Sequence, residues 1–153
     1  MAKRYWLFKS EPSSYSIDDL ARDRRTGWDG VRNYQARNLL RDEIAVGDGV
    51  LFYHSSCEPM AVVGTATVVR AGHVDPTQFD RHDHHFDPDA RPEEPRWFMV
   101  EIAFDRKLRQ PMTLAAIKQV PGLAKMLLVK RGMRLSVQPV TAEEWKLVCK
   151  LGQ

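Results

Sequence analysis

The sequence predicts an α+β domain in which short helices surround a curled sheet or a small barrel. Most strand-like runs lie in the middle of the 153-residue chain, and short helical patterns lie towards both ends. Strands and helices do not alternate regularly, which argues against a doubly wound parallel sheet. Apolar residues make up 43% of the chain, which is enough for one core, so we expect a single domain over residues 1–153.

Local patterns place the elements of the first third. The aromatic and aliphatic run Tyr5–Lys9 predicts a buried strand. Ser16 and Asp19 have the spacing of a capping box and predict a short helix after Ser16. A further helix is expected to begin near Asn33. Its predicted apolar face consists of Ala36, Leu39, Leu40 and Ile44.

The rest of the chain predicts strands followed by helices. Strands are expected over residues 47–56, 61–70 and 97–104, and Gly64 suggests a bulge in the second of them. Short helices are expected over residues 112–120 and 123–128, a strand over 134–140 and a closing helix over 141–151. That last helix begins with the capping-box pair Thr141 and Glu144.

The long polar loop at residues 80–95 separates two of these strands and contains His82, His84 and His85. Loops of this length are usually functional lids or mobile segments. Histidines and aspartates suggest a metal, but the loop is rich in proline and has no cysteine to complete a rigid ligand set. We therefore expect no metal site and no cofactor.

Charge is unevenly distributed, although the net charge is only +3. Residues 106–142 contain eight Lys or Arg and no acid, whereas residues 75–94 contain seven acids. A basic surface of this kind either attracts phosphates or is simply solvated.

Motifs of common enzymes are missing from the sequence. It has no G-x-S-x-G elbow, no P-loop and no G-x-G-x-x-G pattern. His54 and Ser55 could be assembled into a hydrolase on paper, yet adjacent residues of a strand point to opposite faces. We therefore expect a non-catalytic protein.

Cysteine usage and hydropathy suggest an intracellular protein. Cys57 and Cys149 have no C-x-x-C or zinc spacing, which favours a reducing compartment such as the cytoplasm, with a nucleoid or nuclear location equally compatible. No apolar run approaches the length of a membrane span, and the N-terminus lacks the pattern of a signal peptide.

The segment WDGVRNYQARN, residues 28–38, concentrates planar groups that stack and form hydrogen bonds. A nucleobase reader needs an aromatic ring for stacking, amides or hydroxyls for the base edge, and cations for phosphates. Trp28 is either this stacking ring or a tryptophan at the edge of the core. Polar residues also end two expected strands, at Lys9–Ser10 and His54–Ser55, and would share one rim if the strands are neighbours.

Four motifs in order, YWLFKSEP, GVRNYQARN, LFYHSSC and RLSVQPV, resemble the EVE domain family over nearly the whole chain. The resemblance implies a PUA-like fold, a small mixed β-barrel flanked by short helices, related to the YTH domains that read a methylated adenine. It also implies binding of nucleic acid, DNA or RNA, through a modified base, in particular a modified cytosine in DNA, held in an aromatic pocket.

The resemblance also assigns residues to this pocket. Trp28 takes the stacking role. The cavity would be lined by Lys9, Ser10, His54, Ser55 and Ser136, and its mouth by Asn33, Tyr34 and Gln35. The phosphate contacts would be Arg32, Arg37, Arg131 and Arg134.

The chain departs from the family pattern in two places. His84 and His85 stand where aromatic residues are usual, and Met60 stands where a glycine is usual. The alternatives to a base reader are a sensor of a free nucleoside or similar small molecule, and a hydrolase acting on nucleic acid or nucleotides.

Overall fold

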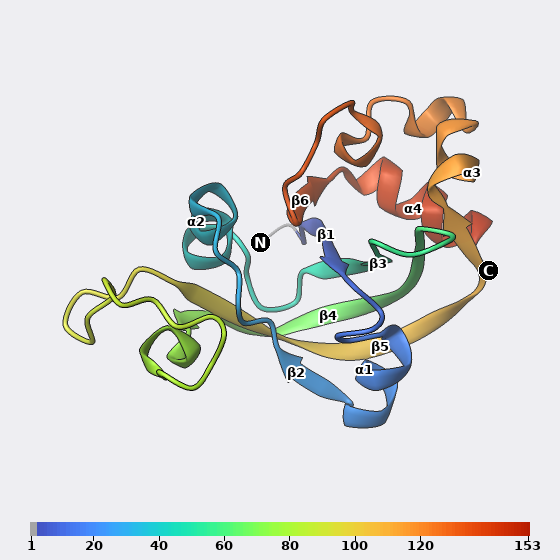
Figure 1. The fold of residues 1–153 in the computed structure, drawn as a ribbon. Coiled ribbons are helices and arrows are strands. Elements are labelled where there is room, and N and C mark those ends of the chain that lie inside the picture. Colours follow the sequence, from blue (N-terminus) through green and yellow to red (C-terminus); the bar gives the residue numbers. More distant parts are fainter. Residues whose placement is uncertain (1–2) are drawn as a thin grey trace.

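A computed structural model describes residues 3–153, so the first two residues of the expected domain lie outside the described part. One mixed sheet of six strands runs in the order β2-β5-β4-β3-β1-β6 (Figure 1). The strands are β1 (Tyr5–Ser10), β2 (Arg25–Gly27), β3 (Gly49–His54), β4 (Ala61–Val74), β5 (Phe98–Thr113) and β6 (Val137–Val140). Strands β1 and β3 are parallel and the remaining pairs are antiparallel. The predicted α+β class with a curled sheet is confirmed.

The long strands β4 and β5 give the sheet its curvature. Their pairing register shifts at several points, one of them between Val62 and Gly64, where the sequence suggests a bulge. Strand β5 extends well beyond the predicted residue 104. Its second half pairs only with β4 among the described residues, and such an edge tolerates the Pro111 that obscured the strand in the sequence.

Within residues 3–153, four α-helices flank the sheet: α1 (Ile17–Asp23), α2 (Tyr34–Asp42), α3 (Leu114–Lys118) and α4 (Ala142–Leu151). Capping boxes start α1 at Ser16 and α4 at Thr141, as the sequence predicts. The helix predicted over residues 123–128 is wrong. Two separate 3-10 turns, Pro121–Leu123 and Leu127–Val129, take its place because the backbone of Met126 between them is extended.

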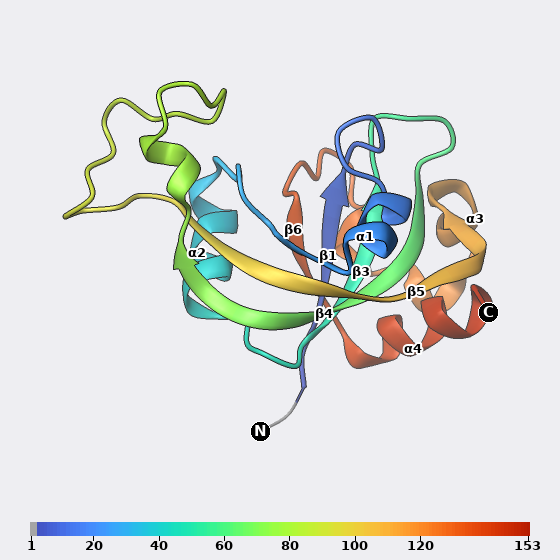
Figure 2. The same ribbon diagram turned by 90° about the horizontal axis from the view of Figure 1, so that it is seen from below.

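Alternating residues of the strands supply two cores, one on each face of the sheet. In β1, Trp6 and Phe8 pack with α1 and α2, whereas Leu7 packs with α3, α4 and the 3-10 turns. The segment between β4 and β5 projects from one end of the sheet beside α2, and α3 and α4 lie at the other end (Figure 2). None of the described helices has the length and apolar character needed to cross a membrane.

Candidate functional site

A cavity of about 610 Å³ opens next to the carboxyl end of β1. Its lining comes from residues 9–11 and 14–15 after the buried part of β1, residues 26–32 after α1, the His84–His85 pair and Ser136. Four segments that are distant in the sequence therefore converge on it. Three of them belong to the motifs that carry the family resemblance.

Trp28 forms an aromatic wall of this cavity. Its backbone N–H donates to the Val100 carbonyl at 2.7 Å, which continues the pairing of β2 with β5. Its ring packs against Phe8 at 5.2 Å and edge-on against Phe52 at 5.5 Å, both in the core. The half-buried indole is thus supported from behind and accessible from the cavity.

Three polar residues expected in the pocket do line the cavity. Ser10 ends β1, Lys9 precedes it, and the Lys9 N–H donates to the Ser136 carbonyl at 2.9 Å. Partial burial lowers the pKa of the Lys9 ammonium. Lys9 also borders a second hollow of about 510 Å³ that Lys130 and Arg131 help to line.

His54 and Ser55 reach the predicted rim but not the cavity lining. Ser10 and His54 are neighbours across the parallel β1–β3 pair, and the Ser55 N–H donates to the Ser10 carbonyl at 2.9 Å. The His54 ring turns to α1, where Nε2 accepts from the Ile17 N–H at 3.1 Å. Because Nε2 is occupied in this way, the ring gives no support to a hydrolase that uses His54 as its base.

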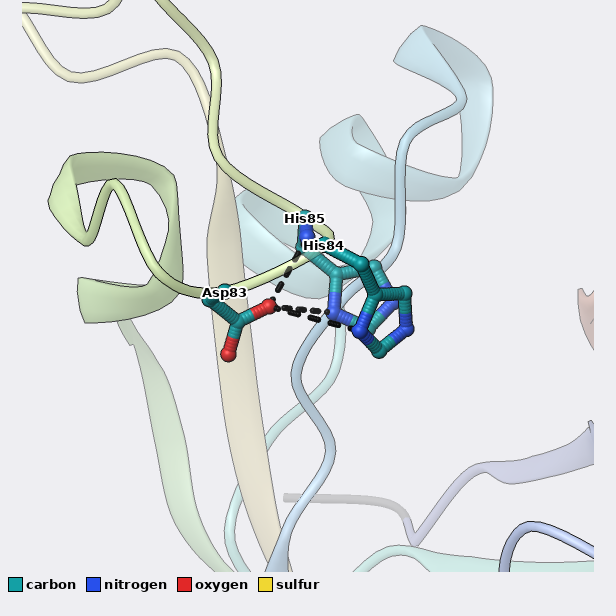
Figure 3. A group of neighbouring side chains, drawn as sticks. All are labelled: Asp83, His84 and His85. Atoms are coloured by element: carbon teal, nitrogen blue, oxygen red, sulfur yellow. Dashed lines mark hydrogen bonds and ion pairs between the residues drawn. The ribbon is translucent and has the colours of Figure 1, made fainter.

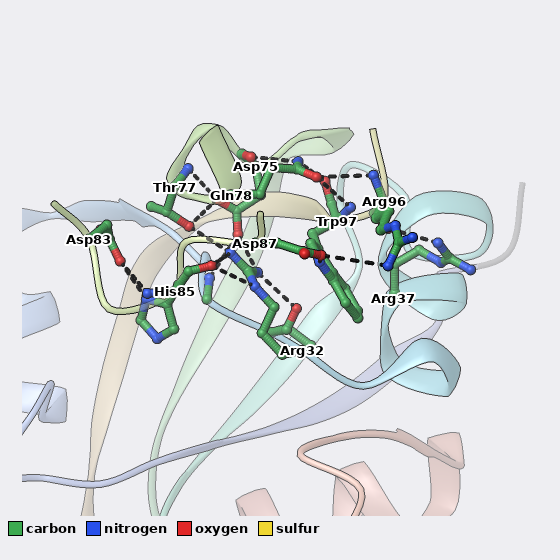
Figure 4. Close-up of polar contacts among 12 residues, drawn as sticks. Arg32, Arg37, Asp75, Thr77, Gln78, Asp83, His85, Asp87, Arg96 and Trp97 are labelled. Carbon is green, nitrogen blue, oxygen red and sulfur yellow. Dashed lines mark hydrogen bonds and ion pairs between the residues drawn. The ribbon is translucent and has the colours of Figure 1, made fainter. Parts of the chain in front are cut away.

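Arg32, expected at a phosphate, instead holds the segment between β4 and β5. Its donors reach Asp75 (3.1 Å), Thr77 (3.0 Å), the Val31 carbonyl (3.0 Å) and, twice, the His85 carbonyl (2.7 and 3.1 Å) (Figure 4). These contacts use all the N–H groups that a guanidinium offers. The geometry leaves Arg32 no donor for a phosphate.

Asp75 is fully buried and receives this guanidinium. Burial alone would raise the pKa of its carboxyl, but hydrogen bonds from Thr77, the Gly30 N–H and Arg32 hold that pKa below its ordinary value. The neighbouring Gln78 is also buried, and its amide bonds the backbone of Asp75, Arg96 and Trp97. The base of the predicted long loop is therefore tightly held.

Tyr34 and Arg37 form a stack outside the cavity. Tyr34 is 53% exposed and packs on Trp97 with ring centres 4.9 Å apart. Arg37 lies over the Tyr34 ring and donates to the Arg96 carbonyl at 2.7 Å. These two residues of the segment WDGVRNYQARN brace α2 against the loop, and neither lines the cavity.

Asn33 and Gln35 lie on a separate shallow hollow. The Asn33 side chain caps α2 by accepting from the Ala36 N–H at 2.9 Å. The hollow also includes Arg131 and Arg134. Both arginines are exposed, and neither forms an ion pair within residues 3–153.

Among the lining residues that sequence reasoning did not assign to the pocket are Tyr15, Glu11 and Asp29. Tyr15 follows β1 by a few residues, and its hydroxyl donates to Asp23 at 2.9 Å. Asp29 directly follows the stacking candidate Trp28, and this position in the motif could have indicated that it lines the pocket. Glu11 lay within the polar end of YWLFKSEP.

His84 and His85 border the cavity and lie next to Asp83 (Figure 3). The Asp83 carboxylate lies 3.0 Å from Nδ1 of His85 and 3.8 Å from Nδ1 of His84. These atoms are close enough to share a cation. The three residues are consecutive in an irregular loop, however, and Asp83 already accepts the His85 N–H at 2.8 Å. The geometry therefore gives no independent indication of a ligand beyond this hydrogen-bonded cluster.

The curled mixed sheet, its flanking short helices and the cavity walled by a supported indole define an α+β domain of the PUA-like kind. The chain belongs to the EVE domain family, whose model matches residues 4–151. Thymocyte nuclear protein 1 of Danio rerio is 44% identical over 165 residues, covering 95% of this chain and 71% of the relative. The human protein of that name is 37% identical, covering 96% of this chain and 73% of the relative.

Solved structures of related proteins have the same fold. A protein from Pseudomonas putida superimposes with a TM-score of 0.93 at 44% identity, covering 97% of this chain and 99% of that one. Human THYN1, solved in complex with DNA containing 5-methylcytosine, superimposes with a TM-score of 0.92 at 36% identity and covers 99% of this chain and 98% of its own.

Proposed function

We propose that this EVE domain is a non-catalytic DNA-binding module that recognises a modified cytosine turned out of the helix into the Trp28 cavity. The observation that carries the proposal is the indole of Trp28, supported by Phe8 and Phe52 and accessible from an open cavity. The complex of human THYN1 with DNA containing 5-methylcytosine supports the same ligand class. The free thiols Cys57 and Cys149 suit an intracellular, reducing location.

Stacking on Trp28 would supply part of the free energy of binding the base. Stacking of a base on an aromatic side chain contributes about 1–3 kcal/mol, and extrusion of a base from a duplex costs a few kcal/mol. Additional contacts are therefore needed to offset the cost of extrusion. Lys9, Ser10 and Ser136 offer polar groups inside the cavity for this purpose.

The basic surface offers contacts to phosphates. Arg131 and Arg134 are exposed and belong to the segment without acids. Arg131 lines one hollow together with Lys9, which also borders the cavity, and a second hollow together with Arg134. Such contacts position the nucleic acid without reading its sequence. We assign the phosphate role to this arginine pair and no longer to Arg32.

A binding experiment tests the proposal. Fluorescence polarisation would compare single- and double-stranded DNA oligonucleotides that differ only by a 5-methyl group on one cytosine. We expect tighter binding to the methylated oligonucleotide and a loss of about tenfold or more in Trp28→Ala, which corresponds to about 1.4 kcal/mol.

A matched control separates the cavity from general effects of losing a tryptophan. Trp145 stacks on Tyr5 in the other core, so Trp145→Phe should leave DNA binding unchanged. If Trp28→Ala, still folded by circular dichroism, binds every oligonucleotide as the wild type does, the proposed site is wrong.

A further inference from the structure

Asp29 places an unpartnered carboxylate in the cavity, next to the aromatic wall. It lines the cavity immediately after Trp28 and is exposed there. No group of residues 3–153 donates a hydrogen bond to it or forms an ion pair with it. The nearby acids differ: Asp75 accepts from Gly30, Thr77 and Arg32, and Asp83 accepts from His85.

The backbone on both sides of Asp29 is fixed. The Trp28 N–H donates to the Val100 carbonyl at 2.7 Å, and the Gly30 N–H donates to the buried Asp75 carboxylate at 2.8 Å. Gly30 has a positive φ of 76°, and the His85 ring packs directly on it. A residue anchored at both neighbours has a defined position relative to the indole, as selective recognition requires.

The electrostatic surroundings disfavour the charged form of this carboxylate. Burial by the cavity walls raises the pKa of Asp29, and the carboxylates of Asp75 and Asp83 raise it further. His85 and Arg32 act in the opposite direction, yet the pKa remains above its ordinary value. A ligand that donates a hydrogen bond here would relieve the unfavourable environment.

Base edges differ in what they offer to a carboxylate. Cytosine presents an amino group at position 4, and Asp or Glu is the side-chain type that accepts from it. Thymine presents a carbonyl oxygen at that position, which would face the carboxylate without a proton between them. A carboxylate that the bound base covers without donating to it is unfavourable, so thymine should bind less tightly than cytosine.

We propose that Asp29 is a specificity residue that accepts a hydrogen bond from the exocyclic amino group of the base stacked on Trp28. The cavity consequently selects cytosine-type bases, methylated or not, over thymine and uracil. This inference rests on the proposed function, because it requires a base in the Trp28 cavity.

Single-stranded oligonucleotides with 5-methylcytosine or thymine at one position give the sharpest test. The two bases carry the same methyl group and differ only in the groups at positions 3 and 4, and a single strand removes any difference in extrusion cost. For the wild type we expect a preference of about tenfold for 5-methylcytosine. Asp29→Asn should abolish or reverse it, since an amide N–H can donate to the thymine carbonyl.

Glu11→Gln is the matched control, because Glu11 is an exposed carboxylate of the same cavity lining. It removes one charge from the cavity and should leave the preference intact. Asp29→Asn should fold normally, as Asp29 supports no other residue, and a thermal melt would establish this.

The outcomes separate the two proposals. An unchanged preference in Asp29→Asn, or an equal loss in Glu11→Gln, overturns the role of Asp29. If Trp28→Ala still weakens binding in that case, the proposed function stands. If Trp28→Ala has no effect on either oligonucleotide, the base is not in this cavity and both proposals fail.

Discussion

The Arg32 guanidinium and the Asp75 carboxylate lie 3.1 Å apart and join the segment that carries Trp28 to the loop that carries His85. Asp75 also accepts from the backbone of Gly30, so one carboxylate holds the segment after β2 to the segment after β4. The cavity wall and the loop that borders it are therefore joined by partly buried hydrogen bonds, in addition to the packing of Trp28 against Phe8 and Phe52.

Arg32→Lys should destabilise the protein by about 2 kcal/mol, since a lysine cannot replace the planar array of hydrogen bonds around a buried acid. Chemical denaturation would measure the free energy of unfolding. Arg70→Lys is the control: Arg70 forms an exposed ion pair with Glu101 at 3.3 Å, which should contribute less than about 1 kcal/mol. Equal losses in the two variants would refute a special role for Arg32.

Gly30→Ala should cost about 2 kcal/mol of stability, because an alanine is strained at a positive φ and its Cβ would lie 2.6 Å from the His85 ring. His85→Ala removes the clash with the ring but leaves the strain at the positive φ. The cost of Gly30→Ala should therefore fall by about 0.5–1 kcal/mol in the His85→Ala background. Strict additivity in this double-mutant cycle would show that the ring moves aside freely.

His54 should make stability depend on pH. Burial lowers its pKa, Lys107 acts in the same direction, and Asp18 opposes them. The folded state thus binds its proton less readily than the unfolded state. The stabilisation is complete above the unfolded value of about 6.5 and is lost as the pH falls through the folded pKa.

Denaturation of the wild type at pH 7.5 and pH 5.5 checks this expectation. Stability should be lower at pH 5.5, because the unfolded chain gains a proton at His54 more readily than the folded state, in which Nε2 accepts from the Ile17 N–H. His54→Gln cannot titrate and should show a smaller difference between the two pH values. A difference as large as that of the wild type would assign the effect to other groups.

Local patterns in the sequence predict much of the framework. The capping boxes at Ser16 and Thr141 and the start of α2 at Asn33 depend on residues a few positions apart. The sequence also predicts that Ser10 and His54 lie at one rim, provided that the strands they end, β1 and β3, are neighbours in the sheet. Family resemblance places Trp28 at a pocket, and the structure gives it a lining position.

Contacts between distant segments explain what the sequence did not predict. Arg32 meets Asp75 43 positions away, and Tyr34 meets Trp97 63 positions away. A cationic or aromatic residue in a binding motif looks the same whether it faces a ligand or a partner in the fold. Only the tertiary arrangement distinguishes Arg32, whose donors are occupied, from Arg131, which is exposed.

The exposed arginines should determine how binding responds to salt. Each phosphate contact in B-form DNA contributes about 0.9 to the slope of the logarithm of affinity against the logarithm of salt concentration. The double variant Arg131→Gln/Arg134→Gln should therefore lower that slope by nearly 2 and weaken methylated and unmethylated DNA equally. Polarisation titrations over a salt series give the slope.

Arg109, exposed beside the C-terminal residues Gly152 and Gln153, supplies the control, and Arg109→Gln should leave the slope unchanged. A slope that falls with Arg109→Gln but not with the double variant would move the DNA to the surface around Arg109.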